Sequence, residues 1–210
     1  MSLTFYTNPM SRGRIVRWML EEVGAPYETV VLDYATTMKA EPYLSINPMG
    51  KVPAIVHDGD VITEGAAICT YLADAFPEAG LAPMPNERAA YYRWMFYAAG
   101  PAEQAVTNRA MGFAPTADQQ RMAGYGNLDF VVDTLEKAVS AHSYIAGERF
   151  TAVDVYAGSQ VAWGVQFGSL PKQAAFEAYL GRILARPAYK RAGAIDDALI
   201  AAAASAAASA

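Results

Sequence analysis

The sequence of 210 residues has little cysteine and histidine: one cysteine, Cys69, and two histidines, His57 and His142. An internal disulfide needs two cysteines, so none can form, and a reducing cytoplasm is the expected location. Transition-metal centres gather several cysteine, histidine or carboxylate ligands at short spacings. Because the two histidines lie far apart in the sequence and there is a single cysteine, we expect no metal.

Basic residues are also few, with 16 Lys and Arg against 21 Asp and Glu and a formal charge of −5 at pH 7. Phosphate binding requires a concentrated basic face, so a nucleic acid is not an expected partner. No apolar run approaches the roughly 20 residues that span a bilayer. The first residues lack the basic and apolar regions of a signal peptide, so no membrane association is expected. With 53% hydrophobic and 18% charged residues, the chain can bury a core.

The first third of the sequence alternates short β-type runs with helical periodicity. Asp58-Gly59-Asp60 separates the last two strands and is typical of a hairpin turn. The expected order is β-α-β-α-β-β-α, with one parallel pairing through a crossover helix and a closing hairpin, which indicates a thioredoxin-like α/β domain. The predicted strands are 3–6, 27–32, 54–57 and 61–63; the predicted helices are 11–23, a weak helix or loop at 36–46, and 65–76.

The rest of the sequence predicts helices alone. Residues 79–86 contain Gly80, Pro83 and Pro85 and are predicted to link a domain at 1–78 to an all-helical domain at 87–210. Thr151 and Asp154 have the spacing of a helix capping box. The predicted helices are 87–109, 117–142, 152–167, 172–185 and 189–198, after which an alanine- and serine-rich tract extends the last helix or frays.

Val52-Pro53 stands at the entry to a predicted apolar strand. Proline donates no ladder hydrogen bond, so Pro53 either starts an ordinary edge strand or marks a place where the backbone pairs with something else. We expect the second, with a cis bond: the N–H and C=O of Val52 would pair with an extended, peptide-like ligand. A helix beginning at Glu64-Gly65 would hold that ligand's carboxylate on its free N–H groups.

The order of these motifs resembles the cytosolic glutathione S-transferases, in a serine-type or related bacterial class, across both predicted domains. Asn47–Pro53 is similar to the family's cis-proline loop, and Thr63–Ile68 to its second glutathione motif. Phe150–Asp154 is similar to the capping box of its second domain, and Ala185–Tyr189 to its late helix junction. Each motif alone has little specificity, whereas four in the right order are specific. The resemblance implies a homodimeric enzyme that conjugates the thiolate of glutathione, its co-substrate, to an apolar electrophile.

The resemblance also implies a serine or cysteine near Ser11 as the donor to the glutathione thiolate. Serine at a helix start is commonly a cap. The same position lets its hydroxyl donate to a thiolate, which the helix N-terminus also favours. Met10 and Arg12 depart from the family's unambiguous spacing, so Asn8 and Tyr6 stay alternatives to Ser11.

Glutathione itself would be held by groups at two motifs. The main chain of Val52, before Pro53, would pair with its thiol-bearing residue, Glu64 would accept from its ammonium, and the Gly65 N–H would take its α-carboxylate. The family usually has serine where this chain has Gly65, so we expect glutathione affinity to be weaker by about one hydrogen bond to a charged group. Lys39 and Lys51 are the candidates for the glycine carboxylate, with Lys51 favoured because it adjoins Val52.

The electrophile pocket is expected between the domains, lined by Met10, Met111 and Phe113. Glu103 or Gln104 is the candidate contact to the γ-glutamyl group in the partner subunit. Two other functions stay open: glutathione-dependent reduction of disulfides or peroxides in the same site, and a binding module that kept the fold without catalysis. The sequence does not identify the physiological electrophile.

Overall fold

The computed structural model describes residues 2–208. Their contacts divide the chain into two compact units: Met1–Gly80 with Ala185–Ala210, here called the sheet unit, and Leu81–Leu184, here called the helical unit. The sheet unit contains, in chain order, β1 (Leu3–Thr7), α1 (Gly13–Val23), β2 (Glu28–Val31), η1 (Thr37–Lys39), α2 (Tyr43–Ile46), β3 (Ala54–His57), β4 (Asp60–Thr63), α3 (Gly65–Ala75), η2 (Pro77–Ala79) and α9 (Pro187–Ala208).

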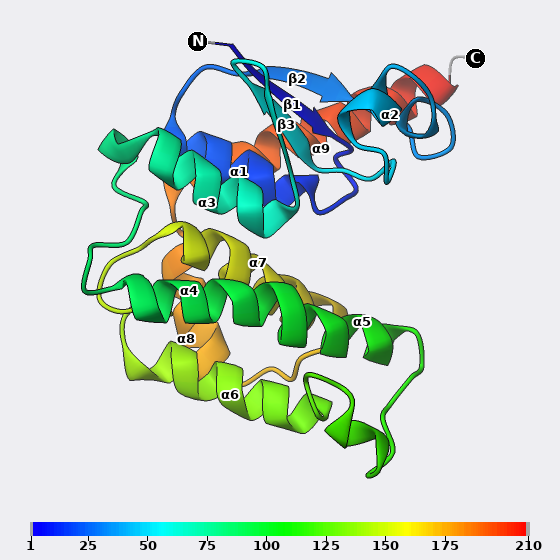
Figure 1. The fold of residues 1–210 in the computed structure, drawn as a ribbon. Helices are drawn as coiled ribbons and strands as arrows, with labels where there is room; N and C mark the ends of the chain where they lie inside the picture. The colour runs from blue at the N-terminus through cyan, green and yellow to red at the C-terminus, as the bar shows by residue number, and fades with distance from the viewer. Residues whose placement is uncertain (1, 209–210) are drawn as a thin grey trace. The chain divides into compact units, whose positions relative to one another are not determined.

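The strands form one sheet in the order β2-β1-β3-β4 (Figure 1). β1 is parallel to β2, while β3 is antiparallel to both β1 and β4. The parallel pair is joined through α1 and the last pair is a hairpin, as predicted. The thioredoxin-like βαβαββα order is confirmed, and the predicted bounds of its strands are correct to within a residue or two.

Side chains of β1 point alternately to the two faces of the sheet. Phe5 is fully buried, with the Arg17 guanidinium of α1 5.0 Å from its ring centre. Tyr6 points to the other face, where its ring lies 5.6 Å from that of Tyr43 in α2. A cluster of Leu32, Met38, Tyr43 and Ala54 packs with Tyr6 on this face. The two faces are therefore covered by different segments, with α1 on one and the η1–α2 region on the other.

Helix α1 begins at Gly13, two residues later than predicted, and ends where Gly24 adopts the left-handed conformation at φ 75°. Glycine accepts that conformation without steric cost, as expected for a helix stop. A Cβ on Gly13 would lie 2.0 Å from Oγ1 of Thr7. Only glycine allows the start of α1 to approach the end of β1 this closely.

Helix α9 runs beside α1 in the sheet unit (Figure 1). The sequence placed this segment in the helical domain 87–210, and the contacts assign it differently. The reason is a seam of polar and aromatic contacts between the two helices, including a buried ion pair of Arg17 with Asp196 and Trp18 stacked edge-on against Tyr189. Periodicity shows that a helix has a buried face, but it does not show which element covers it.

The helical unit consists of α4 (Arg88–Tyr97), a π-helical segment η3 (Ala98–Ala102), α5 (Glu103–Ala110), η4 (Gln119–Arg121), α6 (Leu128–Ala141), α7 (Ala152–Phe167) and α8 (Ala174–Ile183). Helix α7 has the predicted bounds, and the Thr151 N–H donates to the Asp154 carboxylate at 2.9 Å as the capping box requires.

The structure corrects one helix prediction and decides between the two outcomes of another. The predicted helix 117–142 begins only at Leu128, because Gly126 takes a left-handed turn at φ 68° and the side chain of Asn127 caps the helix by accepting from Phe130 N at 2.9 Å. The predicted helix 189–198 extends to Ala208, since the alanine-rich tract has high helix propensity.

Candidate functional site

The pairing of the strands brings three of the predicted motifs together at one end of the strands, here called the sheet edge. Tyr6 pairs with Ala54, and Ala54 pairs with Thr63. Because β3 is antiparallel to both neighbours, the end of β1, the start of β3 and the end of β4 lie side by side. The loop that follows β1 therefore lies beside the Val52-Pro53 bond and the start of α3, although both are at least 40 residues away from it in the sequence.

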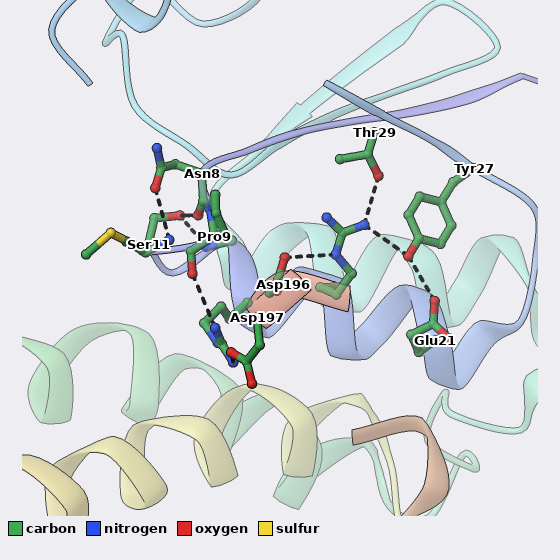
Figure 2. Close-up of polar contacts among 12 residues, drawn as sticks. Asn8, Pro9, Ser11, Glu21, Tyr27, Thr29, Asp196 and Asp197 are labelled. Atoms are coloured by element: carbon green, nitrogen blue, oxygen red, sulfur yellow. Dashed lines mark hydrogen bonds and ion pairs between the residues drawn. The ribbon is translucent and has the colours of Figure 1, made fainter. Parts of the chain in front are cut away.

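The loop between β1 and α1 is held by its own polar groups (Figure 2). The Ser11 hydroxyl donates to the carbonyl of Asn8 at 2.6 Å and accepts from Gly13 N at 2.9 Å. The Asn8 side chain accepts from Met10 N at 2.9 Å and donates to the Leu32 carbonyl at 2.8 Å. The N-cap residue of α1 is Arg12, which makes no side-chain cap, and the Ser11 hydroxyl accepts from the first helical residue instead. The hydrogen of that hydroxyl is directed to a neutral carbonyl, and among the described residues one N–H of the Asn8 amide is left over.

The Val52–Pro53 bond is cis, as predicted; the Glu41–Pro42 bond is also cis and was not predicted. The peptide between Lys51 and Val52 is held in place by hydrogen bonds to its carbonyl, which belongs to Lys51. The Lys51 carbonyl accepts from the Tyr43 hydroxyl and, at 2.8 Å, from the side-chain amide of Asn47. A trans peptide points its C=O and N–H in opposite directions. The Val52 N–H therefore points away from Tyr43 and Asn47, and among the described residues neither it nor the Val52 carbonyl has a hydrogen-bond partner.

Tyr43 and Asn47 were missed as site residues. Asn47 also accepts from Met49 N at 3.1 Å, closing an Asx turn, and an asparagine before a proline is a recognisable turn signal. Tyr43 carries no such signal, because its role depends on α2 packing under the loop. Burial raises the pKa of Tyr43 to about 12, so its hydroxyl stays a donor at neutral pH.

Of the two candidate lysines, Lys39 is tied to this loop. Its ammonium donates to the carbonyl of Gly50, although the two residues are 11 positions apart. Gly50 has φ 55°, and a Cβ there would lie 2.9 Å from the Met38 carbonyl. The Lys51 side chain is exposed. Lys39 is therefore held on the carbonyl two residues before Val52, whereas Lys51 is exposed beside Val52 in the chain.

Glu64 immediately precedes α3 with φ 66° and ψ 117°, outside the regions that non-glycine residues normally occupy. Such a conformation costs about 1–3 kcal/mol and is concentrated at functional sites. Its side chain makes no capping hydrogen bond and is exposed. The first N–H groups of α3, beginning at Gly65, have no intrahelical acceptors, so an anion could bind there.

This geometry agrees with what comparisons with known proteins show. Residues 1–74 match the family model described as glutathione S-transferase, N-terminal domain. A glutathione S-transferase of Xanthomonas campestris pv. campestris is 31% identical over 198 residues, which is 87% of this chain and 93% of the relative. The chain belongs to the glutathione S-transferase family.

Solved structures of glutathione transferases have the same fold. One from Methylococcus capsulatus superposes with a TM-score of 0.77 at 27% identity, over 93% of this chain and 98% of that one. A sphingomonad glutathione S-transferase solved in complex with glutathione gives a TM-score of 0.72 at 28% identity, over 92% and 98% of the two chains. The chain therefore has the fold of these glutathione transferases over nearly its whole length.

The residues predicted to contact the electrophile and the partner subunit are mostly exposed or make structural contacts. Met10 in the sheet unit and Met111 and Phe113 in the helical unit are exposed. Phe113 lines a groove of about 260 Å³ formed within the helical unit. Glu103 accepts from the Tyr156 hydroxyl at 2.9 Å, so its carboxylate has a structural partner. Gln104 is exposed. The electrophile and partner-subunit roles of these residues stay predictions.

Cys69 is completely buried, and desolvation raises the pKa of its thiol, so it is not a reactive nucleophile. Within residues 2–208 no three or more His, Cys, Asp or Glu side chains are grouped to hold a metal ion. No helix among these residues has both the length and the apolar character to cross a bilayer.

Proposed function

We propose that this glutathione transferase conjugates the thiolate of glutathione to an apolar electrophile. The observation that carries the proposal concerns Val52. Its N–H and C=O have no hydrogen-bond partner among residues 2–208, while the preceding carbonyl, that of Lys51, is held by two side chains. An extended peptide can pair with such a main chain as an added strand would. Glutathione is a tripeptide with a carboxylate at each end, which suits both this edge and the start of α3.

The contacts follow from the arrangement at the sheet edge. The thiol-bearing residue pairs with Val52, and the γ-glutamyl carboxylate binds the N–H groups beginning at Gly65. Glu64, exposed beside them, accepts from the γ-glutamyl ammonium. Lys39 and Lys51 are the proposed contacts of the glycine carboxylate, because their opposite charge favours binding it.

Ser11 is the proposed donor to the thiolate. Its hydroxyl now donates to the Asn8 carbonyl, and rotation about the Cβ–Oγ bond would redirect it to the sulfur. A charged acceptor forms the stronger hydrogen bond, so bound thiolate favours the redirected state. The Gly13 N–H can still donate to Ser11. Asn8, with its unused amide N–H, is the first alternative donor, and Tyr6, which faces the α2 side, is the second.

Catalysis then consists of placing a stabilised thiolate against the electrophile, with no covalent bond to the enzyme. The sulfur attacks the electrophilic carbon, and the leaving group departs with its electron pair. We keep Met10, Met111 and Phe113 as the proposed contacts of an apolar substrate. We also propose a homodimer, with Glu103 or Gln104 as the contact to the partner's glutathione, and a cytoplasmic location, where glutathione is kept reduced.

The test of the donor uses two variants of Ser11. Ser11→Thr keeps a hydroxyl that can accept from Gly13 N, whereas Ser11→Ala removes it. We expect Ser11→Ala to lower kcat with a model haloarene by about tenfold to hundredfold, the effect of losing one hydrogen bond to a charged group. The thiolate fraction of bound glutathione, read by its ultraviolet absorbance, falls with it. Ser11→Thr should retain both. An unchanged Ser11→Ala would exclude Ser11 and move the role to Asn8.

The test of the reaction compares substrates. Wild-type protein is assayed with glutathione and a haloarene, and separately with a glutathione-capped disulfide, while calorimetry measures glutathione binding. Haloarene turnover with glutathione binding below the millimolar range supports the proposal. Turnover of the disulfide alone would indicate a reductase, and the absence of binding would indicate a module without catalysis.

A further inference from the structure

Two buried side chains donate to one carbonyl oxygen next to Val52, the residue with which glutathione is proposed to pair. Tyr43, 2% exposed, and Asn47, 4% exposed, both donate to the Lys51 carbonyl. The Asn47 carbonyl in addition accepts from Gly50 N at 2.8 Å, and its side-chain oxygen accepts from Met49 N. The turn from Asn47 to Lys51 is therefore held by hydrogen bonds among its own residues. The carbonyl of the peptide between Lys51 and Val52 is held by two donors, the side chains of Tyr43 and Asn47.

We propose that Tyr43 and Asn47 are positioning residues for glutathione, which fix the plane of the peptide between Lys51 and Val52 so that the Val52 N–H faces the ligand. This inference rests on the proposed function, in which glutathione pairs with the main chain of Val52. Neither side chain contacts glutathione; each acts through the Lys51 carbonyl. A trans peptide is planar, so holding its oxygen on one side directs its N–H to the other.

The donor pattern also excludes the opposite orientation. If the peptide turned over, the Val52 N–H would face the Asn47 amide N–H, which is donor against donor. The Tyr43 hydroxyl would lose its acceptor in a buried place, and an unpaired buried polar group is costly. Because burial raises the pKa of Tyr43 to about 12, its hydroxyl also keeps its hydrogen at neutral pH. The two donors together thus select one orientation before the ligand arrives.

A substitution that reverses one donor tests this directly. Asn47→Asp keeps the oxygen that accepts from Met49 N but replaces the amide donor with a carboxylate, which repels the Lys51 carbonyl and attracts the Val52 N–H. We expect KM for glutathione to rise by about tenfold at neutral pH, about the effect of one hydrogen bond to a charged group. At lower pH the protonated acid can donate again, so the ratio of its KM to that of the wild type should fall towards one.

Tyr43→Phe removes the other donor without reversing it. Asn47 still holds the oxygen, so KM for glutathione should rise by only about threefold, the effect of a neutral hydrogen bond. The double variant should exceed the product of the single effects, because no donor then remains. Tyr71→Phe is the matched control: it loses the hydrogen bond of its hydroxyl to His57 in the same unit and should leave KM unchanged. In all four variants kcat at saturating glutathione should change less than KM.

The orientation of the peptide is also measurable without glutathione. Amide hydrogen exchange followed by NMR should show a fast-exchanging Val52 N–H in the wild type and a protected one in Asn47→Asp. Failure of the wild type to bind glutathione would overturn the proposed function, whereas the exchange result would still decide the orientation. An Asn47→Asp variant with unchanged Val52 exchange, or with a KM ratio independent of pH, would overturn the positioning role.

Discussion

Arg17 and Asp196 form an ion pair that is closed to solvent at both ends. The Arg17 Nε lies 3.1 Å from the Asp196 carboxylate, and each side chain is 1% exposed. Nη1 of the guanidinium donates to the hydroxyls of Tyr27 and Thr29 at 3.1 and 2.8 Å (Figure 2). This pair connects residues 179 positions apart and fixes the last helix of the chain against the first.

Breaking this pair should destabilise the protein strongly. Asp196→Ala leaves a buried guanidinium without its counter-ion, which costs about 3–5 kcal/mol of unfolding free energy. The neighbouring Asp197 pairs with Arg14 in a largely exposed contact. Asp197→Ala is therefore the matched control, with an expected loss below about 1 kcal/mol. Urea denaturation measures both, and equal losses would show that burial does not set the value of these pairs.

Gly65→Ser should increase glutathione affinity. Gly65 begins α3, and a hydroxyl there adds a donor for the γ-glutamyl carboxylate. A hydrogen bond to a charged group contributes about 1.5–3 kcal/mol, so Kd should fall by about tenfold or more. Gly65→Ala, which adds the Cβ without the hydroxyl, separates the two effects in calorimetry. If both variants bind alike, the α-carboxylate does not reach this position.

Gly50→Ala should weaken glutathione binding beyond its effect on stability. Gly50 has φ 55°, and its Cβ would lie 2.9 Å from the Met38 carbonyl, so the loop before Val52 must move. Gly59 in the β3–β4 turn has φ 97° with nothing within 4 Å of a Cβ. Both alanine variants should lose about 1 kcal/mol from the unfavourable φ. Only Gly50→Ala should raise KM for glutathione, and an equal rise in Gly59→Ala would contradict this assignment.

Asp154 should make stability depend on pH in the acid range. Burial raises the pKa of Asp154 to about 6 from its ordinary 3.8, although hydrogen bonds from Ile145, Thr151 and Tyr179 act in the opposite sense. Between these values the folded state binds a proton that the unfolded state has lost. Stability from this group therefore falls as pH rises from about 4 to about 6, by about 3 kcal/mol in total.

The control for this effect is Asp154→Asn, which has no titratable group at the position. The difference in unfolding free energy between wild type and variant, measured in urea at several pH values, should shrink across this range as pH rises. A difference that stays constant, or that grows with pH, would show that the hydrogen bonds outweigh burial.

The local sequence was sufficient wherever neighbours along the chain decide the structure. Gly24 ended α1, and Thr151 with Asp154 began α7 at the predicted residue, because caps and stops act within a few residues. The same reasoning failed for 117–142. There, the left-handed turn at Gly126 and the cap at Asn127 interrupt the helical periodicity and delay the start of α6 to Leu128.

The candidate site was predictable where a motif carries main-chain chemistry. Val52, Pro53, Glu64 and Gly65 were identified because proline and a helix start have fixed hydrogen-bonding consequences. Tyr43 was not, because its hydroxyl reaches Lys51 only after α2 packs against the loop.

The sequence by itself determined the strand and helix order of the sheet unit, the motifs at its edge and the family to which the chain belongs. These depend on turn chemistry and periodicity, which are local. Only the tertiary structure decided that α9 belongs with α1 and that the hydrogen of Ser11 is directed to Asn8. It alone also showed that two buried side chains, Tyr43 and Asn47, donate to the Lys51 carbonyl. Each of these depends on contacts between distant segments, whose free energy exists only once the chain has folded.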